Sequence, residues 1–133
     1  MSVVWSATSL ESGYFDGLGR HTSVEQLTSH LAKLRTLGRG HVEVLLPGSD
    51  FPALTLSFQG DHAVVHLFAD SDVVHLHTGD GTVAPDSEVE VPVMDELACF
   101  TGAYVLGTDH ACGVVCEFVR AGRLGSPGDW QAV

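Results

Sequence analysis

The chain has 133 residues, 44 % of them hydrophobic, which suits one folded domain over residues 1–133 and excludes a disordered tail. Its formal net charge is -11 at pH 7, and no lysine or arginine occurs from Gly40 to Val119, where thirteen of the seventeen acidic residues lie. A field of one sign repels nucleic acid and anionic membranes, so we expect neither as a partner and expect a basic protein instead.

The first forty residues predict a strand, a loop and a helix. Residues 2–10 alternate enough to form a strand, and the glycine-containing pairs within residues 12–17 mark a loop. Ser23 is a suitable N-cap, with Gln26 three residues later as the partner of a capping box, and Gly38 would end the helix. The apolar stripe of this helix consists of Val24, Leu27, Leu31 and Leu34.

From His41 to Val91 the hydrophobic period changes to two, which is typical of strands. Tight turns are expected at residues 59–62 and 70–72, and short connections favour antiparallel neighbours, so these strands should form a meander. Alternation also implies one face on the core and one in water. The expected strands cover residues 42–46, 54–58, 63–67, 73–78 and 88–91.

Residues 103–106 could form a last strand, and Thr108 or Asp109 would then cap a second helix that ends at Gly122. Its expected buried stripe consists of Cys112, Val115, Cys116 and Val119. The predicted fold class is therefore α+β: an antiparallel β-sheet meander of about five or six strands, with two helices packed on one face.

Eight histidines raise the possibility of a metal site. If the hairpin at residues 70–72 has a simple register, His66 lies across from His75, and His77 shares their face near Glu88 or Glu90. Three imidazoles so placed could bind zinc with an open position. The alternative, which we favour, is a solvated sheet face that happens to carry histidines.

The three cysteines offer a second set of soft ligands, together with His110. Cys99, Cys112 and Cys116 lack the spacing of paired Cys-x-x-Cys sites, so we interpret them as small, reduced hydrophobic residues and expect neither metal nor cofactor. An odd cysteine count, no signal-peptide pattern and no apolar run of roughly 18 residues together indicate a cytoplasmic protein.

Four aspartates crowd the two loops that precede and follow residues 73–78. Paired carboxylates could act as acid and base, but aspartates beside Gly and Ser more often form turns. No nucleophile elbow, phosphate-binding loop or dinucleotide fingerprint occurs, so we expect no enzymatic activity. A binding surface on these loops is the alternative we favour, because a rigid scaffold often carries its function on loops. The predicted partner-binding residues are Asp70, Asp72, Asp80, Asp86, Glu88 and Trp130.

The order of features along the chain matches a known pattern. Residues 51–56 read FPALTL, a Gly60-Asp61 turn leads into AVVHLF at residues 63–68, and EVEV follows at residues 88–91. The chain closes with CEFVRAGRL at residues 116–124, then Pro127 and Trp130. From about residue 42 onward this resembles the Imm1 family of immunity proteins from bacterial polymorphic toxin systems. Residues 92–102 and 125–129 depart from the family pattern.

This resemblance implies a cytosolic α+β antitoxin that binds and neutralises a cognate toxin and has no chemistry of its own. Toxins paired with this family are often deaminase-type proteins that act on nucleic acid. A toxin of that kind needs basic surface around its active site, and an acidic inhibitor would cover it. Two alternatives stay open: a small metal- or carboxylate-dependent hydrolase, and a self-associating adaptor module. The oligomeric state also stays open between monomer and weak dimer.

Overall fold

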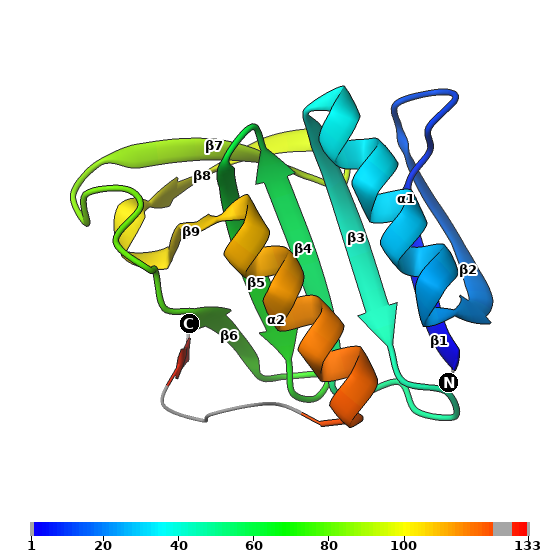
Figure 1. Cartoon of the computed structure of the whole chain (residues 1–133). Coiled ribbons are helices and arrows are strands. Elements are labelled where there is room, and N and C mark those ends of the chain that lie inside the picture. Colours follow the sequence, from blue (N-terminus) through cyan, green and yellow to red (C-terminus); the bar gives the residue numbers. More distant parts are fainter. Residues whose placement is uncertain (1, 124–128, 133) are drawn as a thin grey trace.

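The computed structural model describes residues 2–123 and 129–132. It shows the expected α+β fold, with both helices on one face of an antiparallel sheet (Figure 1). The main sheet has eight strands, more than the five or six expected, in the order β10-β6-β5-β4-β3-β1-β2 with β9 beside β5. Its strands are β1 (Ser2–Thr8), β2 (Phe15–Ser23), β3 (Arg39–Leu45), β4 (Ala53–Gln59), β5 (His62–Phe68), β6 (Val74–His77), β9 (Leu106–Gly107) and β10 (Trp130–Ala132).

Helix α1 (Val24–Leu37) forms where the sequence predicts it. The Ser23 hydroxyl accepts a hydrogen bond from the Gln26 N–H, and Gly38 ends the helix with a φ of 95°, which a side chain would strain. All four residues of the expected stripe are buried against the sheet, which confirms the prediction. Each such leucine contributes about 1.5–3 kcal/mol of burial free energy.

Helix α2 (Thr108–Ala121) ends at Gly122 as predicted, but its buried face differs from the expected one. Ala111, Val115 and Phe118 point into the core, whereas Cys112 and Cys116 lie half-buried at its side. Phe118 has more apolar surface to bury than either cysteine, and this decides the rotation of the helix. At fourteen residues each, neither α1 nor α2 reaches the length and apolarity needed to cross a membrane.

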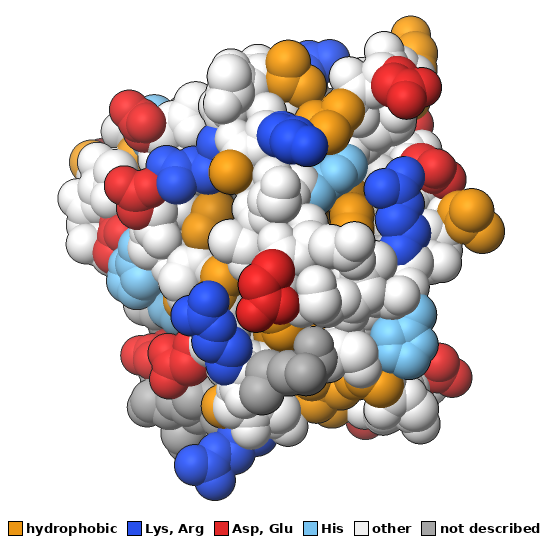
Figure 2. Space-filling model, turned by 45° about the vertical axis from the view of Figure 1, so that its right-hand side comes forward, with side chains coloured by type: hydrophobic (Ala, Val, Ile, Leu, Met, Phe, Trp, Pro, Cys, Tyr) orange, Lys and Arg blue, Asp and Glu red, His pale blue; other side chains and the backbone are white. Residues whose placement is uncertain are grey.

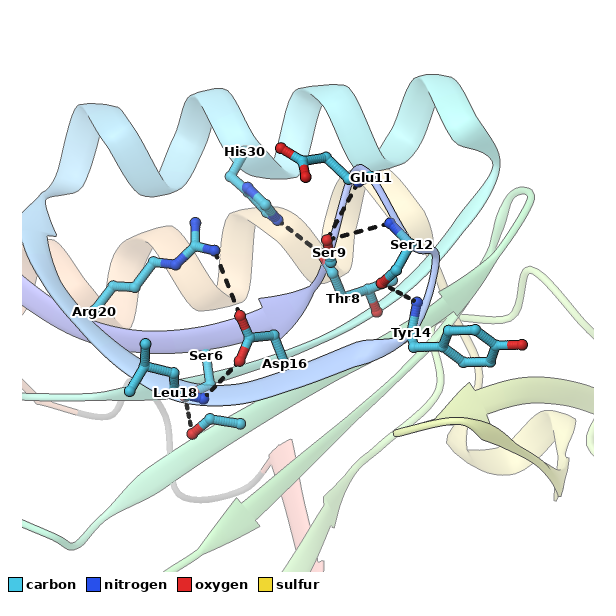
Figure 3. Close-up of polar contacts among 11 residues, drawn as sticks. Ser6, Thr8, Ser9, Glu11, Ser12, Tyr14, Asp16, Leu18, Arg20 and His30 are labelled. Atoms are coloured by element: carbon cyan, nitrogen blue, oxygen red, sulfur yellow. Dashed lines mark hydrogen bonds and ion pairs between the residues drawn. The ribbon is translucent and has the colours of Figure 1, made fainter.

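Strand β2 occupies a segment that the sequence indicates as partly loop. It pairs with β1 at the edge of the sheet, and the register shifts so that residues 17–19 bulge opposite Ser6. The Asp16 carboxylate holds this bulge, because it accepts a hydrogen bond from the Leu18 N–H and faces Arg20 (Figure 3). An exposed, bulged edge strand shows no alternation of buried and polar residues, so its signal is weak.

Strands β7 (Glu88–Val93) and β8 (Glu96–Thr101) form a separate hairpin instead of extending the meander. Figure 1 shows this hairpin behind the sheet, on the face opposite the helices. It buries a second apolar cluster built on Val64, Leu76, Val91 and Val105. The expected water-facing side of the sheet is therefore covered in part, and Ser57 on that side is fully buried.

Candidate functional site

The predicted partner-binding aspartates lie at the two ends of strand β6. Asp70 and Asp72 are in the β5–β6 turn, whereas Asp80 and Asp86 follow β6 in the loop that leads to β7. Four residues of strand span about 13 Å, so the two groups are separate on the surface. A partner would have to cover both ends of β6 to contact all four side chains.

The β6–β7 loop is braced along its length by the short 3-10 helix η1 (Gly102–Tyr104). The Gly79 N–H donates to the Ala103 carbonyl at 2.7 Å, and the Gly102 N–H donates to the Ser87 carbonyl at 2.8 Å. A Cβ built on Gly102 would lie 1.9 Å from the Ala84 carbonyl oxygen, so the two segments pack backbone against backbone. The loop is thus a preorganised part of the surface.

The Asp80 carboxylate is an internal anchor of this loop. One oxygen accepts hydrogen bonds from the Gly107 N–H at 2.9 Å and from His110 Nδ1 at 3.0 Å, at the first turn of α2. The other oxygen accepts bonds from the N–H and hydroxyl of Thr82. Burial raises the pKa of the Asp80 carboxyl, but the hydrogen bonds from Thr82, Gly107 and His110 outweigh burial and bring the pKa well below its usual range. Asp80 therefore caps α2 from a distant loop.

Replacing this anchor should destabilise the fold. We expect Asp80→Asn to lower the free energy of unfolding by about 1–2 kcal/mol at pH 7, because an amide cannot accept hydrogen bonds at both ends. The folded pKa is depressed, so the contribution is present above the ordinary aspartate pKa and declines as the pH falls below it. Urea unfolding at pH 7 and pH 3 measures this, and the difference from wild type should shrink at pH 3.

The matched control for this prediction is Asp72→Asn, which also removes one loop carboxylate. Asp72 is exposed, and we expect a change within about 0.5 kcal/mol at either pH. Equal unfolding midpoints for the Asp80 and Asp72 variants at pH 7 would contradict the anchoring role.

Asp70 forms a turn, as the alternative interpretation of these loops predicts. Its Oδ1 accepts hydrogen bonds from the backbone N–H groups of Asp72 at 2.8 Å and Val73 at 3.0 Å. The Asp72 side chain projects from this turn and is exposed. Both acids of this turn are exposed, but only the Asp70 carboxylate holds the turn.

The available charge of the β6–β7 region lies on three exposed side chains, Asp86, Glu88 and Glu90, which we name the acidic ridge. Along β7 the two glutamates alternate with Val89 and Val91, which face the sheet. Of the thirteen acids between residues 40 and 119, only three are in ion pairs within the described residues (Glu43, Asp80 and Asp109), which leaves ten without one. None of the ridge acids is among those three.

Basic side chains are concentrated elsewhere. Lys33 and Arg35 are on α1 and Arg120 is on α2, and Figure 2 shows Lys and Arg interspersed with acids over this part of the surface. Arg35 also pairs with Asp109 across the two helices. These three basic side chains are therefore on the helices, on the other side of the sheet from the hairpin that carries Glu88 and Glu90.

The acidic ridge alters the one exposed thiol beside it. Cys99 Sγ lies 3.4 Å from the Glu88 carboxylate across the β7–β8 pair. Its hydrogen bond to Glu88 raises the pKa of the Cys99 thiol, and slight desolvation with the charges of Glu88 and Glu90 raises it further. A higher pKa lowers the thiolate fraction, so Cys99 is exposed but poorly nucleophilic.

This effect is measurable as a reaction rate. In a Cys112→Ser/Cys116→Ser background, Glu88→Gln should increase the rate of Cys99 alkylation by iodoacetamide at pH 7.5 by about threefold or more, since one pKa unit changes the thiolate fraction up to tenfold. Glu117→Gln, on the outer face of α2, serves as the control with the same change in net charge. The same rate in both variants would show that Glu88 does not set the reactivity.

Trp130 is a structural anchor more than a protruding contact. It begins β10 and pairs with His77 on β6, and its ring lies 4.9 Å from the His77 ring in an edge-on arrangement. The side chain is half-buried against the main core. The exposed part of its ring lies at the edge of the main sheet, because β10 is the edge strand beside β6.

His66 does not share a face with His75 and His77, so the hairpin register on which the three-histidine hypothesis depended is wrong. The structure pairs His66 with Leu76 and Leu67 with His75, which puts His66 on the side of the β7–β8 hairpin and His75 on the helix side. The reason is the turn: the Ala69 N–H donates to the Val73 carbonyl, which leaves three residues in the loop. Pairing His66 with His75 would need an even number of loop residues. A shift of one residue in the strand register moves every side chain of that strand to the other face of the sheet.

The soft ligands are likewise dispersed. Cys99 is on β8, whereas Cys112 and Cys116 are on α2 with His110 at its first turn. Over residues 2–123 and 129–132, no group of three or more His, Cys, Asp or Glu side chains is arranged to hold a metal. Burial is the main cause that raises the pKa of the Cys112 thiol, which suits a half-buried packing residue.

Ser57, His41 and Glu43 form a line of polar contacts across β3 and β4, and the sequence does not reveal it. His41 Nδ1 lies 2.7 Å from the Ser57 hydroxyl, and His41 Nε2 lies 3.5 Å from the Glu43 carboxylate. The order of groups resembles an activated nucleophile, but Ser57 is 0 % and His41 is 1 % exposed. No substrate reaches that hydroxyl, so the line satisfies buried polar groups.

A groove of about 420 Å³ lies on the sheet face opposite the helices. Its walls are mainly apolar, with Val4, Leu45, Ala53 and Phe68 among the lining residues and the Glu43 carboxylate between them. Only the antiparallel register of β1, β3, β4 and β5 brings these residues together. Hydrophobic periodicity assigns them to a face but does not indicate that part of that face is left open.

Comparison with protein-family models gave no match for this chain, and comparison with curated proteins gave none.

Proposed function

We propose that this protein is a cytoplasmic immunity protein that binds a basic toxin and blocks its active site without chemistry of its own. The observation that carries the proposal is the acidic ridge: three exposed carboxylates without ion-pair partners among the described residues, on a braced loop and hairpin. Preorganised charge of one sign attracts a basic surface and loses little conformational entropy when it binds.

The ridge and Asp72 together define the contact area. A standard protein interface covers about 800 Å² on each partner, which is wide enough to include both ends of the short strand β6. Asp70 and Asp80 support this surface through the turn and the loop that they hold, and Trp130 packs between those ends on β6. Some of the predicted residues therefore contact the partner in this proposal, and the others hold the contacting surface in place.

The resemblance to the Imm1 family supports a toxin of the deaminase type that acts on nucleic acid. Such an enzyme must attract a phosphate backbone, so its active-site rim is expected to be basic. An acidic ridge competes for that same rim, because both ligands are drawn by the same field. Inhibition would then follow from steric and electrostatic blockade.

The test uses the toxin encoded beside the gene. Asp86→Asn/Glu88→Gln/Glu90→Gln should slow association with that toxin by about tenfold and flatten its salt dependence, with the dissociation rate changed much less. The control is Glu11→Gln/Glu25→Gln/Glu117→Gln, which removes the same charge from exposed sites elsewhere. Surface plasmon resonance at 50 and 200 mM salt measures both variants. No binding by the wild type, or equal slowing by both triple variants, would overturn the proposal.

A further inference from the structure

The groove on the open sheet face combines apolar walls with one acid. Val4, Leu45, Ala53 and Phe68 provide the apolar surface, and Glu43 is the sole charged residue among the described residues that line it. The Glu43 side chain is 36 % exposed, and its carboxylate makes a long 3.5 Å contact with His41 Nε2. The carboxylate thus keeps acceptor capacity toward the groove.

That acid determines which occupant fits. A purely apolar group in the groove would strip water from Glu43 and offer no replacement, which is strongly unfavourable for a carboxylate. An anion would add repulsion to a chain that already carries a net charge of -11. A cation on a long apolar stem, by contrast, covers the apolar walls and pairs with the carboxylate.

The rim of the groove favours a protein over a small molecule. Leu18, at the bulge of β2, is 72 % exposed, and Phe51 is 40 % exposed. Figure 3 shows Leu18 beside Ser6, which lines the groove. Phe51 also lines the groove, but a ligand confined to the groove would leave Leu18 in water, whereas a protein surface would cover Leu18 together with the groove.

We propose that this groove receives an arginine or lysine side chain of the protein partner, with its stem on the Val4–Leu45–Phe68 wall and its charge at Glu43. This rests on the proposed function, because the partner is the same basic protein, and it adds a second contact outside the acidic ridge, on the part of the same sheet face that is left open. The ridge governs the speed of encounter, and the groove holds one inserted side chain in place.

Gly19 makes the site testable without disrupting the fold. Gly19 lines the groove, and a Cβ built there lies 3.7 Å from Val4 Cγ1, an ordinary contact, so the backbone at position 19 accepts a side chain. Gly19→Leu is therefore a blocking variant, and Glu43→Gln removes the charge while it keeps the shape. The ridge variant Asp86→Asn/Glu88→Gln/Glu90→Gln is the matched control, because it removes charge from side chains that do not line the groove.

The experiment titrates the labelled protein with Ac-Leu-Arg-Leu-NH2 and with the same peptide carrying neutral citrulline, followed by ¹H–¹⁵N correlation spectra. The arginine peptide should shift the amides of β1, β3 and β4 around Glu43, with a Kd at least tenfold below that of the citrulline peptide. Glu43→Gln should abolish this preference, Gly19→Leu should weaken both peptides, and the ridge variant should bind as the wild type does.

Two results would overturn the groove proposal: equal Kd values for the two peptides, or shifts confined to β7 around the acidic ridge. The second result leaves the proposed function standing on the ridge alone. If the protein does not bind the toxin but the arginine peptide still shifts the amides around Glu43, the proposed function is overturned instead. The two failures are therefore distinguishable.

Discussion

Gly102→Ala is expected to lower the free energy of unfolding by roughly 3 kcal/mol or more, one of the largest losses available from a single methyl group in this chain. The added Cβ would lie 1.9 Å from the Ala84 carbonyl oxygen and 2.7 Å from its carbon. Both are backbone atoms, so the overlap cannot be relieved by a side-chain rotation. The β6–β7 loop must move, and the hydrogen bond from the Gly102 N–H to Ser87 would be strained with it.

Urea unfolding measures this effect, and Gly113→Ala is its matched control. Gly113 is an exposed glycine of α2 whose Cβ would meet nothing within 4 Å. Alanine there should stabilise the protein by about 0.5–1 kcal/mol, because glycine is a poor helix residue. The Gly102 variant should also associate more slowly with the toxin, since the loop that carries Asp86 is displaced. An unchanged unfolding midpoint for Gly102→Ala would contradict the close packing.

His66→Phe is expected to remove most of a stability loss that the wild type shows between pH 7 and pH 4.5. Desolvation by burial, together with the charge of nearby His41, lowers the pKa of His66 from 6.5 to about 4. Its ring lies among apolar groups, 5.5 Å from the Phe100 ring and 6.2 Å from the Phe68 ring. Phenylalanine keeps this aromatic packing and cannot be protonated.

The direction of this pH dependence of stability follows from proton linkage. Between pH 6.5 and pH 4 the unfolded chain binds a proton at His66 and the folded protein does not, so stability falls as the pH falls. A shift of this size corresponds to about 2 kcal/mol at pH 4.5. Chemical unfolding at both pH values measures it, with the exposed His21→Gln as the control that should keep the wild-type pH dependence. If His66→Phe kept the pH dependence of the wild type, His66 would not be buried as a neutral ring.

Both predictions concern packing around the β7–β8 hairpin and the segment that follows it. Gly102 follows β8 and lets the chain pack closely on the β6–β7 loop, whereas His66 on β5 is covered by Phe100 of that strand. The hairpin therefore supports the acidic ridge and excludes water from the part of the sheet face beside the groove. Loss of its packing should affect stability and association together.

Local signals were sufficient for the elements whose causes are local. Ser23 and Gly38 bound α1 because a cap and a left-handed glycine act within one turn of the chain. Strands β3, β4 and β5 follow from period-two alternation and a tight turn at Gly60, so the meander and the α+β class are confirmed. The functional interpretation of the acidic loops stays a prediction.

Features that depend on contacts between distant segments could not be predicted in this way. Strand β2 was missed because a bulged edge has no clear alternation, and β8 was missed because the short turn at Met94 returns it onto β7. Asp80 was predicted to contact a partner, and the sequence did not indicate that its carboxylate accepts hydrogen bonds from Gly107 and His110, which lie far along the chain.

The amino-acid sequence by itself determined the helices, the alternating strands and the absence of positive charge from Gly40 to Val119, since each of these depends on neighbours in the chain. Tertiary structure alone decided the register that separates His66 from His75, the hairpin that covers part of a sheet face, and the groove around Glu43. The physical reason is that periodicity assigns a residue to a face of its own strand. Which residues share that face is set by turn length and by packing against segments far away in sequence.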